Sequence, residues 1–285
     1  MGNPGLGLIK KLTDLDTLLS TADTDDLTFL PRSLVMATLP HSNQGSKIVW
    51  ERRSGNFVLK VLSAHDHGLP YGTYPRLFAM WLTNEILRTG KKHIELEGSY
   101  YAFLQALHLD TNGGVRRRFK DQVDRLLSSA ISLDVQIPGH SKHQMAIIAD
   151  EKNLWWDPKH PHDQTLWKTD IRVNEAFYNH VMQCSVPLDI RIVNALKKSP
   201  LALDLYAWMT YRYFYLKKET LIPWRLLSHQ FGSDYTRVRD FKEKLKAYLV
   251  AVHTAYPAAR FDMDDRGLTL KPSPPSIQPK LLPGW

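Results

Sequence analysis

Residues 117–127 read RRFKDQVDRLL, and residues 239–249 read RDFKEKLKAYL. Aligned without a gap, the two segments match at Arg117/Arg239, Phe119/Phe241, Lys120/Lys242, Asp121/Glu243, Val123/Leu245 and Leu127/Leu249. A second pair of similar segments lies upstream of these copies. It consists of AMWLT at 79–83 and AWMT at 207–210, in which Trp81 aligns with Trp208. Both pairs occur in the same order and at nearly the same offset. The sequence therefore predicts a module used twice, each copy containing a basic amphipathic helix.

The amino-acid composition is that of a soluble globular protein, and its excess of positive charge favours binding to polyanions. The chain has 285 residues, enough for two domains, with 43% hydrophobic and 23% charged residues. Its formal net charge is +8, and excess positive charge attracts nucleic acid first of all. Cys184 is the single cysteine, which excludes an internal disulfide and a thiolate metal cluster. We expect a cytoplasmic location, because neither a signal peptide nor a membrane-spanning apolar run is present.

Periodicity and turn residues predict the same order of elements in both halves. The first half should contain a helix from Pro75 to Gly90, a strand at 93–97, a helix capped by Ser99, a basic helix from Val115 to Ser129 and a hairpin of 131–137 with 143–149. The second half should contain a helix from Pro200, a strand at 220–222, a helix from Pro223 to Phe231, a basic helix from Asp234 to Val252 and a hairpin around Asp264–Gly267. Both orders are typical of a winged helix.

The fold class predicted is α+β, mainly α, with two tandem winged-helix domains. The first domain spans 28–158, the second 159–272, and a proline-rich flexible tail covers 273–285. The preceding segment, 1–27, carries Leu8, Leu12, Leu15 and Leu19 at helical spacing. This stripe suits a helix packed on the first domain, or a docking helix for a partner or second copy.

The second basic helix carries the first set of candidate DNA-binding residues. Its apolar stripe contains Val238, Phe241, Leu245, Tyr248 and Leu249, which leaves the opposite face cationic. The candidates are Tyr235, Thr236, Arg237, Arg239, Lys242 and Lys246. In helix-turn-helix proteins the N-terminal turn of such a helix enters the major groove, where Arg binds guanine and lysines further along bind phosphates. The alternative is an ordinary solvated helix face.

The first basic helix carries the remaining candidates, which are Arg116, Arg117, Arg118 and Lys120. Asp121 and Asp124 share its outer face and weaken its attraction for phosphate. We therefore expect the second helix to dominate base-specific contact, and the first to contact the DNA backbone or to mediate self-association. Simultaneous contact with one duplex requires both cationic faces to lie on the same side of the molecule.

The sequence supports a catalytic function less well than a DNA-binding function. No P-loop motif is present, and we expect no catalytic residue, metal or cofactor. His65-Asp66-His67 resembles the two-histidine metal strand of rolling-circle nickases, except that Asp replaces the hydrophobic residue between the histidines. His140, His143, His160 and His162 are interpreted as polar loop residues, and Asp262, Asp264 and Asp265 as part of a hairpin tip.

A family resemblance rests on GLPYGTYPRLFAMWLTNEILRTG at 68–90, followed by residues 99–131. These segments resemble plasmid-encoded RepA replication initiators, related to TrfA-like proteins, over roughly residues 28–272. The resemblance implies two winged-helix domains, binding to repeated origin sequences (iterons) in double-stranded DNA, opening of the adjacent duplex and recruitment of a host initiator and the replicative helicase. It also implies repression of the initiator's own gene by a dimer.

Two other functions remain open from the sequence. A winged-helix transcriptional repressor would bind one operator, typically an inverted repeat, whereas an initiator would bind tandem repeats. An origin nickase would cleave single strands or form a covalent adduct with DNA.

Overall fold

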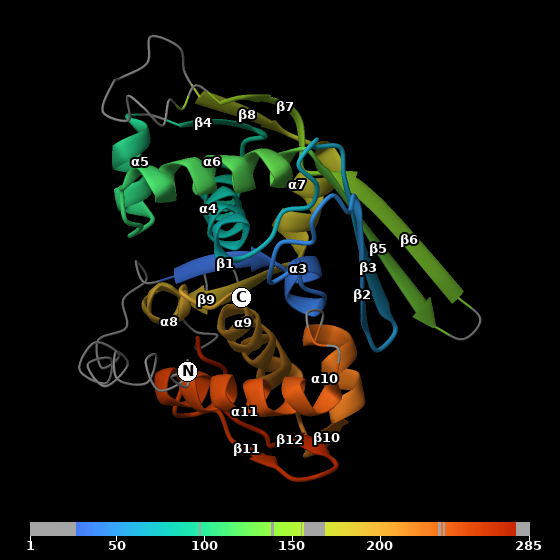
Figure 1. The fold of residues 1–285 in the computed structure, drawn as a ribbon. Coiled ribbons are helices and arrows are strands. Elements are labelled where there is room, and N and C mark those ends of the chain that lie inside the picture. The colour runs from blue at the N-terminus through green and yellow to red at the C-terminus, as the bar shows by residue number, and fades with distance from the viewer. Residues whose placement is uncertain are drawn as a thin grey trace.

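The computed structural model describes residues 27–277 except 97, 138–139, 155, 157–168, 233–234 and 236 (Figure 1). The predicted helix at 8–19, Trp155, His160, His162 and Thr236 lie outside the described residues. The described residues form helices and four antiparallel sheets around one extended core.

The middle of the molecule joins segments that are far apart in the chain. Strand β1 (Leu27–Pro31) pairs antiparallel with β9 (Ser185–Asp189). The short helix α3 (Arg32–Met36) follows β1, and helices α4 (Thr73–Thr89), α7 (Glu175–Gln183), α8 (Ile190–Leu196) and α9 (Pro200–Tyr215) pack around the pair. In Figure 1, helix α6 (Gly113–Leu127) crosses the view above this middle part and helix α11 (Val238–Ala255) crosses below it.

The second module has the predicted order of elements. It consists of α9, β10 (Thr220–Pro223), α10 (Trp224–Phe231), α11 (Val238–Ala255), β11 (Phe261–Met263) and β12 (Gly267–Leu270). Its sheet has the order β10-β12-β11, so the last strand lies in the middle. The predicted helix starts at Asp234, but α11 begins at Val238, with Arg237 as its extended N-cap residue.

The first module repeats this connectivity. Its elements are α4, β4 (His93–Leu96), α5 (Tyr100–Ala106), α6 (Gly113–Leu127), β7 (Ala149–Asn153) and β8 (Thr169–Val173). The sheet order is β4-β8-β7, again with the last strand in the middle. This sheet continues across the domain boundary predicted at 158/159, since β8 pairs with both β4 and β7. The duplication seen in the sequence is thus a duplication of topology.

The hairpin after the first basic helix forms, but the prediction that it is this module's wing is wrong. Strands β5 (Ser129–Ile137) and β6 (His140–Ile147) belong to a separate sheet with β2 (Val49–Ser54) and β3 (Phe57–Ser63). β5 pairs with β3 along its length, from Ser63↔Ser129 to Phe57↔Val135. The hairpin therefore extends a sheet that began before the module, and β7 and β8 take the place of the wing strands.

Helix ends are set by residues that the sequence offers for capping. The side chains of Ser99, Asn112 and Ser199 accept hydrogen bonds from the first-turn N–H groups of α5, α6 and α9. Helix α4 ends at Gly90, whose φ of 65° is the left-handed conformation that glycine adopts without strain. These signals explain why the sequence predicts where α5 and α9 begin and where α4 ends.

A buried ion pair joins the two modules. Arg76 of α4 donates to both carboxylate oxygens of Asp204 in α9, each at 2.7 Å, and the pair is almost fully buried. His41 contacts the same carboxylate at 2.8 Å. Burial opposes ionisation of Asp204, but Arg76 and His41 outweigh it and lower the pKa of Asp204. Arg76 also donates to the carbonyl oxygens of Leu39, Pro40 and Gly72, so its guanidinium is fully engaged.

The ordered chain continues beyond residue 272, where the flexible tail is predicted to begin. Ile277 is buried, the Tyr256 hydroxyl donates to the carbonyl of Pro274, and the Tyr206 hydroxyl contacts Ser276 at 2.8 Å. Residues 273–277 are therefore packed against α9 and α11. Trp156 is also buried and stacks on Tyr100 at 4.9 Å, as core packing requires. Among the described residues, we find no helix whose length and apolar character would let it cross a lipid bilayer.

Candidate nucleic-acid interface

Helix α6 buries one face and exposes its cations on the other, as the sequence predicts. Phe119, Val123 and Leu126 are completely buried. Arg117 and Arg118 are exposed, whereas Arg116 and Lys120 are half-buried. Arg116 donates to the Thr111 carbonyl and Arg118 to the Gly114 carbonyl, so both guanidinium groups are held near the N-terminus of the helix.

The two acids of α6 are engaged away from these arginines. Asp121 pairs with Arg125 at 3.0 Å, and Asp124 pairs with Lys152 of β7 at 3.1 Å. Both ion pairs lie in the C-terminal half of the helix, and each neutralises one negative charge. The acids therefore weaken the attraction of α6 for phosphate less than the sequence suggested.

Helix α11 differs from α6, because two arginines at its start have acidic partners on the same helix. Arg237 pairs with Asp240 at 2.8 Å, and Arg239 pairs with Glu243 at 3.4 Å. The side chains of Arg237 and Arg239 are 79% and 85% exposed. Ion pairs exposed to this degree contribute about 0–1 kcal/mol, so a phosphate or a base edge can replace the acid at little cost.

Two lysines of α11 lie over an indole ring of the preceding helix. The Nζ atoms of Lys242 and Lys246 are 5.2 and 5.9 Å from the centre of the Trp224 ring. Lys242 also pairs with Asp265 at 3.0 Å, and Lys242 lowers the pKa of that carboxyl group. The ring and Asp265 thus hold Lys242 between α11 and the β11–β12 turn.

The β11–β12 turn confirms the hairpin interpretation of the acidic cluster. The carboxylate of Asp264 accepts from the backbone N–H groups of Arg266 and Gly267, at 2.8 and 3.1 Å. A Cβ atom on Gly267 would lie 2.1 Å from the carbonyl oxygen of Ile222, so this position requires glycine. Asp264 is thus a turn residue.

Two residues that the sequence assigned to the second basic helix lie elsewhere than predicted. Tyr235 precedes the helix instead of lying in its first turn, and its half-buried ring packs edge-to-face on Phe241 at 5.8 Å. Val238, predicted in the buried stripe, is 50% exposed. Both errors arise because the helix starts four residues later than predicted, so the buried face begins at Phe241.

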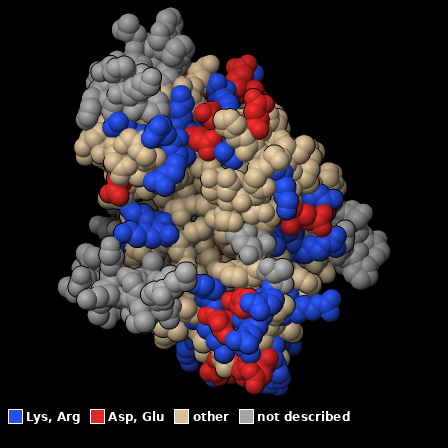
Figure 2. Space-filling view, viewed as in Figure 1, with Lys and Arg blue, Asp and Glu red and all other residues tan. Residues whose placement is uncertain are grey.

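Figure 2 shows Lys and Arg side chains over both α6 and α11 on one face of the molecule. Over α11 they are mixed with acidic side chains, in agreement with its ion pairs. The face between the two helices is mostly uncharged. The arrangement thus meets the condition that both cationic helices can be reached from one side.

Sequence reasoning missed two cations next to this face. Lys197 and Lys198 follow α8, and together with Arg118 of α6 they line a hollow at the N-terminal end of α4. The dipeptide is visible in the sequence but falls between predicted elements, and no periodicity connects it with α6.

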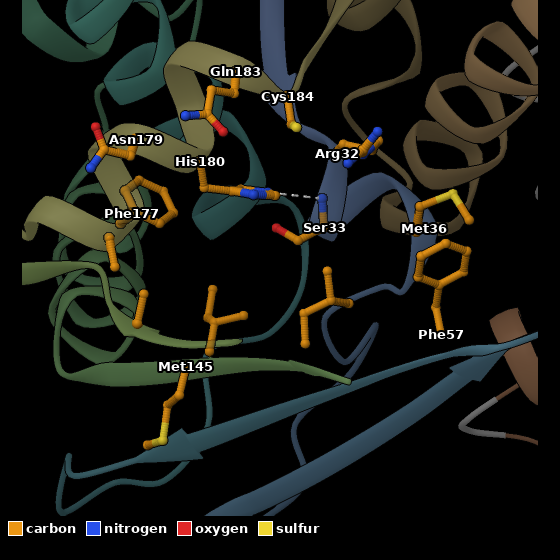
Figure 3. Close-up of a pocket in the computed structure, with 14 residues that line it drawn as sticks. Arg32, Ser33, Met36, Phe57, Met145, Phe177, Asn179, His180, Gln183 and Cys184 are labelled. Carbon is orange, nitrogen blue, oxygen red and sulfur yellow. Dashed lines mark hydrogen bonds between the residues drawn. The ribbon is translucent and has the colours of Figure 1, made fainter. Parts of the chain in front are cut away.

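A second pocket, of about 490 Å³, lies between α3, α7 and the β3-β5-β6 part of the large sheet (Figure 3). Met36, Phe57, Met145 and Phe177 contribute apolar surface to its lining. The backbone N–H of Ser33 donates to His180 Nε2 at 3.4 Å, and burial together with Arg32 lowers the pKa of His180. This hydrogen bond connects α7 with α3.

The histidines considered for a nickase lie in the turn between β3 and α4. The rings of His65 and His67 are 5.3 Å apart, and His67 Nδ1 lies 3.6 Å from Asp121. Within the described part of the chain, no three His, Cys, Asp or Glu side chains gather in a way that could hold a metal ion.

Comparison with known proteins gives one family match. The model of the family described as "Plasmid encoded RepA protein" matches residues 69–224, more than half of the chain. No curated protein matches.

Two solved structures of RctB are similar in part. A structure of RctB domains 2 and 3 is 11% identical, with 76% of this chain and 83% of that chain covered and a TM-score of 0.48. A second structure of these domains is 12% identical, with 84% and 96% covered and a TM-score of 0.47.

Proposed function

Since the chain belongs to the family of plasmid-encoded RepA proteins, which are plasmid replication initiators, we propose that it binds the repeated sequences of a plasmid origin as double-stranded DNA. The two modules are then winged-helix domains, with α6 and α11 as recognition helices and the β11–β12 turn as one wing. The observation that carries this proposal is the exposure of both cationic helices on one face of the molecule (Figure 2).

Binding would be non-covalent and strongly salt-dependent. Arg116, Arg117, Arg118 and Lys120 on α6, and Lys242 and Lys246 on α11, supply cations for phosphates of the backbone. Each phosphate neutralised releases counterions, so affinity falls steeply as salt rises. Contact over two stretches of groove also supplies the several kcal/mol that bending or opening of the duplex costs by elastic estimates.

Sequence preference would come mainly from the start of α11. Arg239 lies in the first turn of the helix, its side chain is 85% exposed, and it forms an exposed ion pair with Glu243. Arg binds the O6 and N7 atoms of guanine in a bidentate manner, worth about 1–3 kcal/mol of discrimination. Arg237 lies one position before the helix and is equally free to exchange Asp240 for DNA.

The test is footprinting of the purified protein on the origin of its own plasmid. Protection of tandem repeats supports the initiator, whereas protection of one inverted repeat supports a repressor of a single operator. The Arg239→Ala variant should lose affinity for origin DNA more than for random DNA. An equal loss on both would show that Arg239 contacts only phosphate. A covalent protein–DNA adduct would establish nickase chemistry instead.

Several consequences of family membership extend this proposal to partners. The protein would act in the cytoplasm, help to open the duplex, and recruit a host initiator and the replicative helicase. It would work without a catalytic centre, metal or cofactor of its own. Self-association as a dimer, with repression of its own gene, would provide copy control.

A further inference from the structure

A basic hollow of about 520 Å³ lies where the N-terminal ends of α4 and α6 approach the segment after α8. Its lining includes Arg118 from α6, Lys197 and Lys198, and a single acid, Asp110. Three cations and one carboxylate give this small space a surplus of positive charge. The residues come from segments about 80 positions apart in the chain, so the fold and not the local sequence creates the cluster.

The cations of the hollow lack the acidic partners that α11 provides for its own. Lys197 Nζ donates to the His108 carbonyl and, at 3.3 Å, to Asn194 Oδ1, both uncharged acceptors. Arg118 Nε donates to the Gly114 carbonyl at 3.2 Å, and Lys198 is exposed. None of the three forms an ion pair with a carboxylate that the structure describes. Burial lowers the pKa of Lys197, only partly opposed by Asp110, so this lysine would gain from an anionic partner.

The backbone at the rim of the hollow adds to the positive potential. Gly72 and Thr73, which begin α4, are lining residues, and no side chain caps this helix end. In contrast, Ser99 and Asn112 cap the neighbouring helices α5 and α6. The partial positive charge of an α-helix N-terminus adds to that of the three cations and favours an anion in the hollow.

We propose that the hollow holds a phosphate of the DNA backbone, bound by Arg118, Lys197 and Lys198; this rests on the proposed function. Arg118 connects the two sites, because it lies on the exposed face of α6 and also lines the hollow. A helix seated in the major groove has the backbone phosphates on both sides of it. Lys197 and Lys198 would therefore extend the contact of α6 from the groove onto the adjoining strand.

The experiment measures binding of the full chain to origin DNA as a function of salt, for Lys198→Gln and for Lys197→Gln/Lys198→Gln. Loss of one phosphate contact should reduce the slope of log K against log salt by about 0.9, which is about fivefold in affinity at 0.15 M salt. The loss should be equal on origin and random DNA, because phosphate carries no sequence information. Phosphate ethylation of the DNA should also reveal one position that interferes with the wild-type protein but not with the double variant.

The matched control is Lys91→Gln, which removes the same charge beyond the other end of α4. That helix has 17 residues and is thus about 25 Å long, and Lys91 is exposed there. Lys198 is exposed too, so its variant should keep the wild-type unfolding midpoint even if Lys197→Gln disturbs the loop at His108.

The possible outcomes distinguish failure of the phosphate site from failure of the proposed function. A Lys198→Gln variant that binds DNA like Lys91→Gln, with an unchanged slope, overturns the phosphate site while the initiator proposal stands. A double variant that loses binding of inorganic phosphate but keeps the wild-type slope on DNA also overturns it, and assigns the hollow to a free anion. If the wild-type protein does not prefer origin DNA to random DNA, the proposed function itself fails.

Discussion

Replacement of Arg76 by Met tests whether the two modules depend on their buried ion pair. The substitution keeps an unbranched side chain in place but removes the guanidinium that contacts Asp204 and three backbone carbonyls. Asp204 would remain buried with His41 as its partner. Removing one member of a buried pair costs about 3–5 kcal/mol, because the remaining buried charge loses its main compensating partner.

That cost is large compared with the stability of a folded protein, which is about 5–15 kcal/mol. Urea unfolding, followed by tryptophan fluorescence, should therefore show a much lower midpoint for Arg76→Met. The Arg88→Met variant is the control, because Arg88 lies on the same helix in an exposed pair with Glu85 at 2.6 Å. Its loss should stay within about 1 kcal/mol.

A double variant separates the pair from the packing around it. Arg76→Met/Asp204→Leu removes both charges, and buried pairs replaced by apolar side chains are often tolerated. It should therefore be more stable than Arg76→Met alone. An Arg76→Met variant that loses less than about 1 kcal/mol, or a double variant as unstable as the sum of the singles, would refute the role assigned to this pair.

Three further outcomes follow from single contacts. Lys246→Ala should reduce the salt slope of DNA binding by about one unit without changing the preferred sequence, and a changed site preference in a binding-site selection would contradict its assignment to phosphate. His180 has a lowered pKa in the folded state, so the unfolded chain binds the proton more readily, and stability should decrease as the pH falls below about 6.5. His180→Gln should make the decrease in unfolding free energy between pH 7.5 and 5.5 smaller, whereas an unchanged decrease would show that other groups cause it. Gly267→Ala should cost about 1–3 kcal/mol in urea unfolding, because its Cβ atom would meet the Ile222 carbonyl at 2.1 Å, and a neutral result would show that the turn relaxes.

Local elements were predictable from the sequence because their signals are local. Ser99 and Gly90 delimit helices where the sequence indicates, and the β11–β12 hairpin forms around its expected turn. The start of α11 was not predictable in this way. Asp234 is a residue type typical of an N-cap, but the helix begins at Val238, and the ring of Tyr235 packs on Phe241 before it.

The pairing of strands that are distant in the sequence could not be predicted from hydrophobic periodicity. The hairpin β5–β6 alternates as a wing would, and only its register with β3 shows that it belongs to another sheet. The pairing of β1 with β9 joins residues more than 150 positions apart, and neither strand was predicted.

The exposure of the cations on α6 and α11 was predictable from the sequence, but their charge balance was not. The cations of α6 and α11 were identified from helical spacing, whereas two of the ion pairs involve distant elements: Asp124 pairs with Lys152 of β7, and Lys242 pairs with Asp265 of the β11–β12 turn. One signal for the ion pair between the modules was present. Arg76 and Asp204 are isolated charges in otherwise apolar helical runs, and such residues require a buried partner.

Under the proposed function, the Arg76–Asp204 contact fixes the spacing at which the two modules bind DNA. Because this buried ion pair joins α4 to α9, the separation of α6 and α11, the proposed recognition helices, would be set before DNA binds. One base pair inserted between the two contact sites on the DNA displaces the second site by about 3.4 Å and rotates it by about 35° around the duplex axis. Binding to such spacing variants should fall to that of one module, and origins served by this protein should tolerate base changes there far better than changes in length.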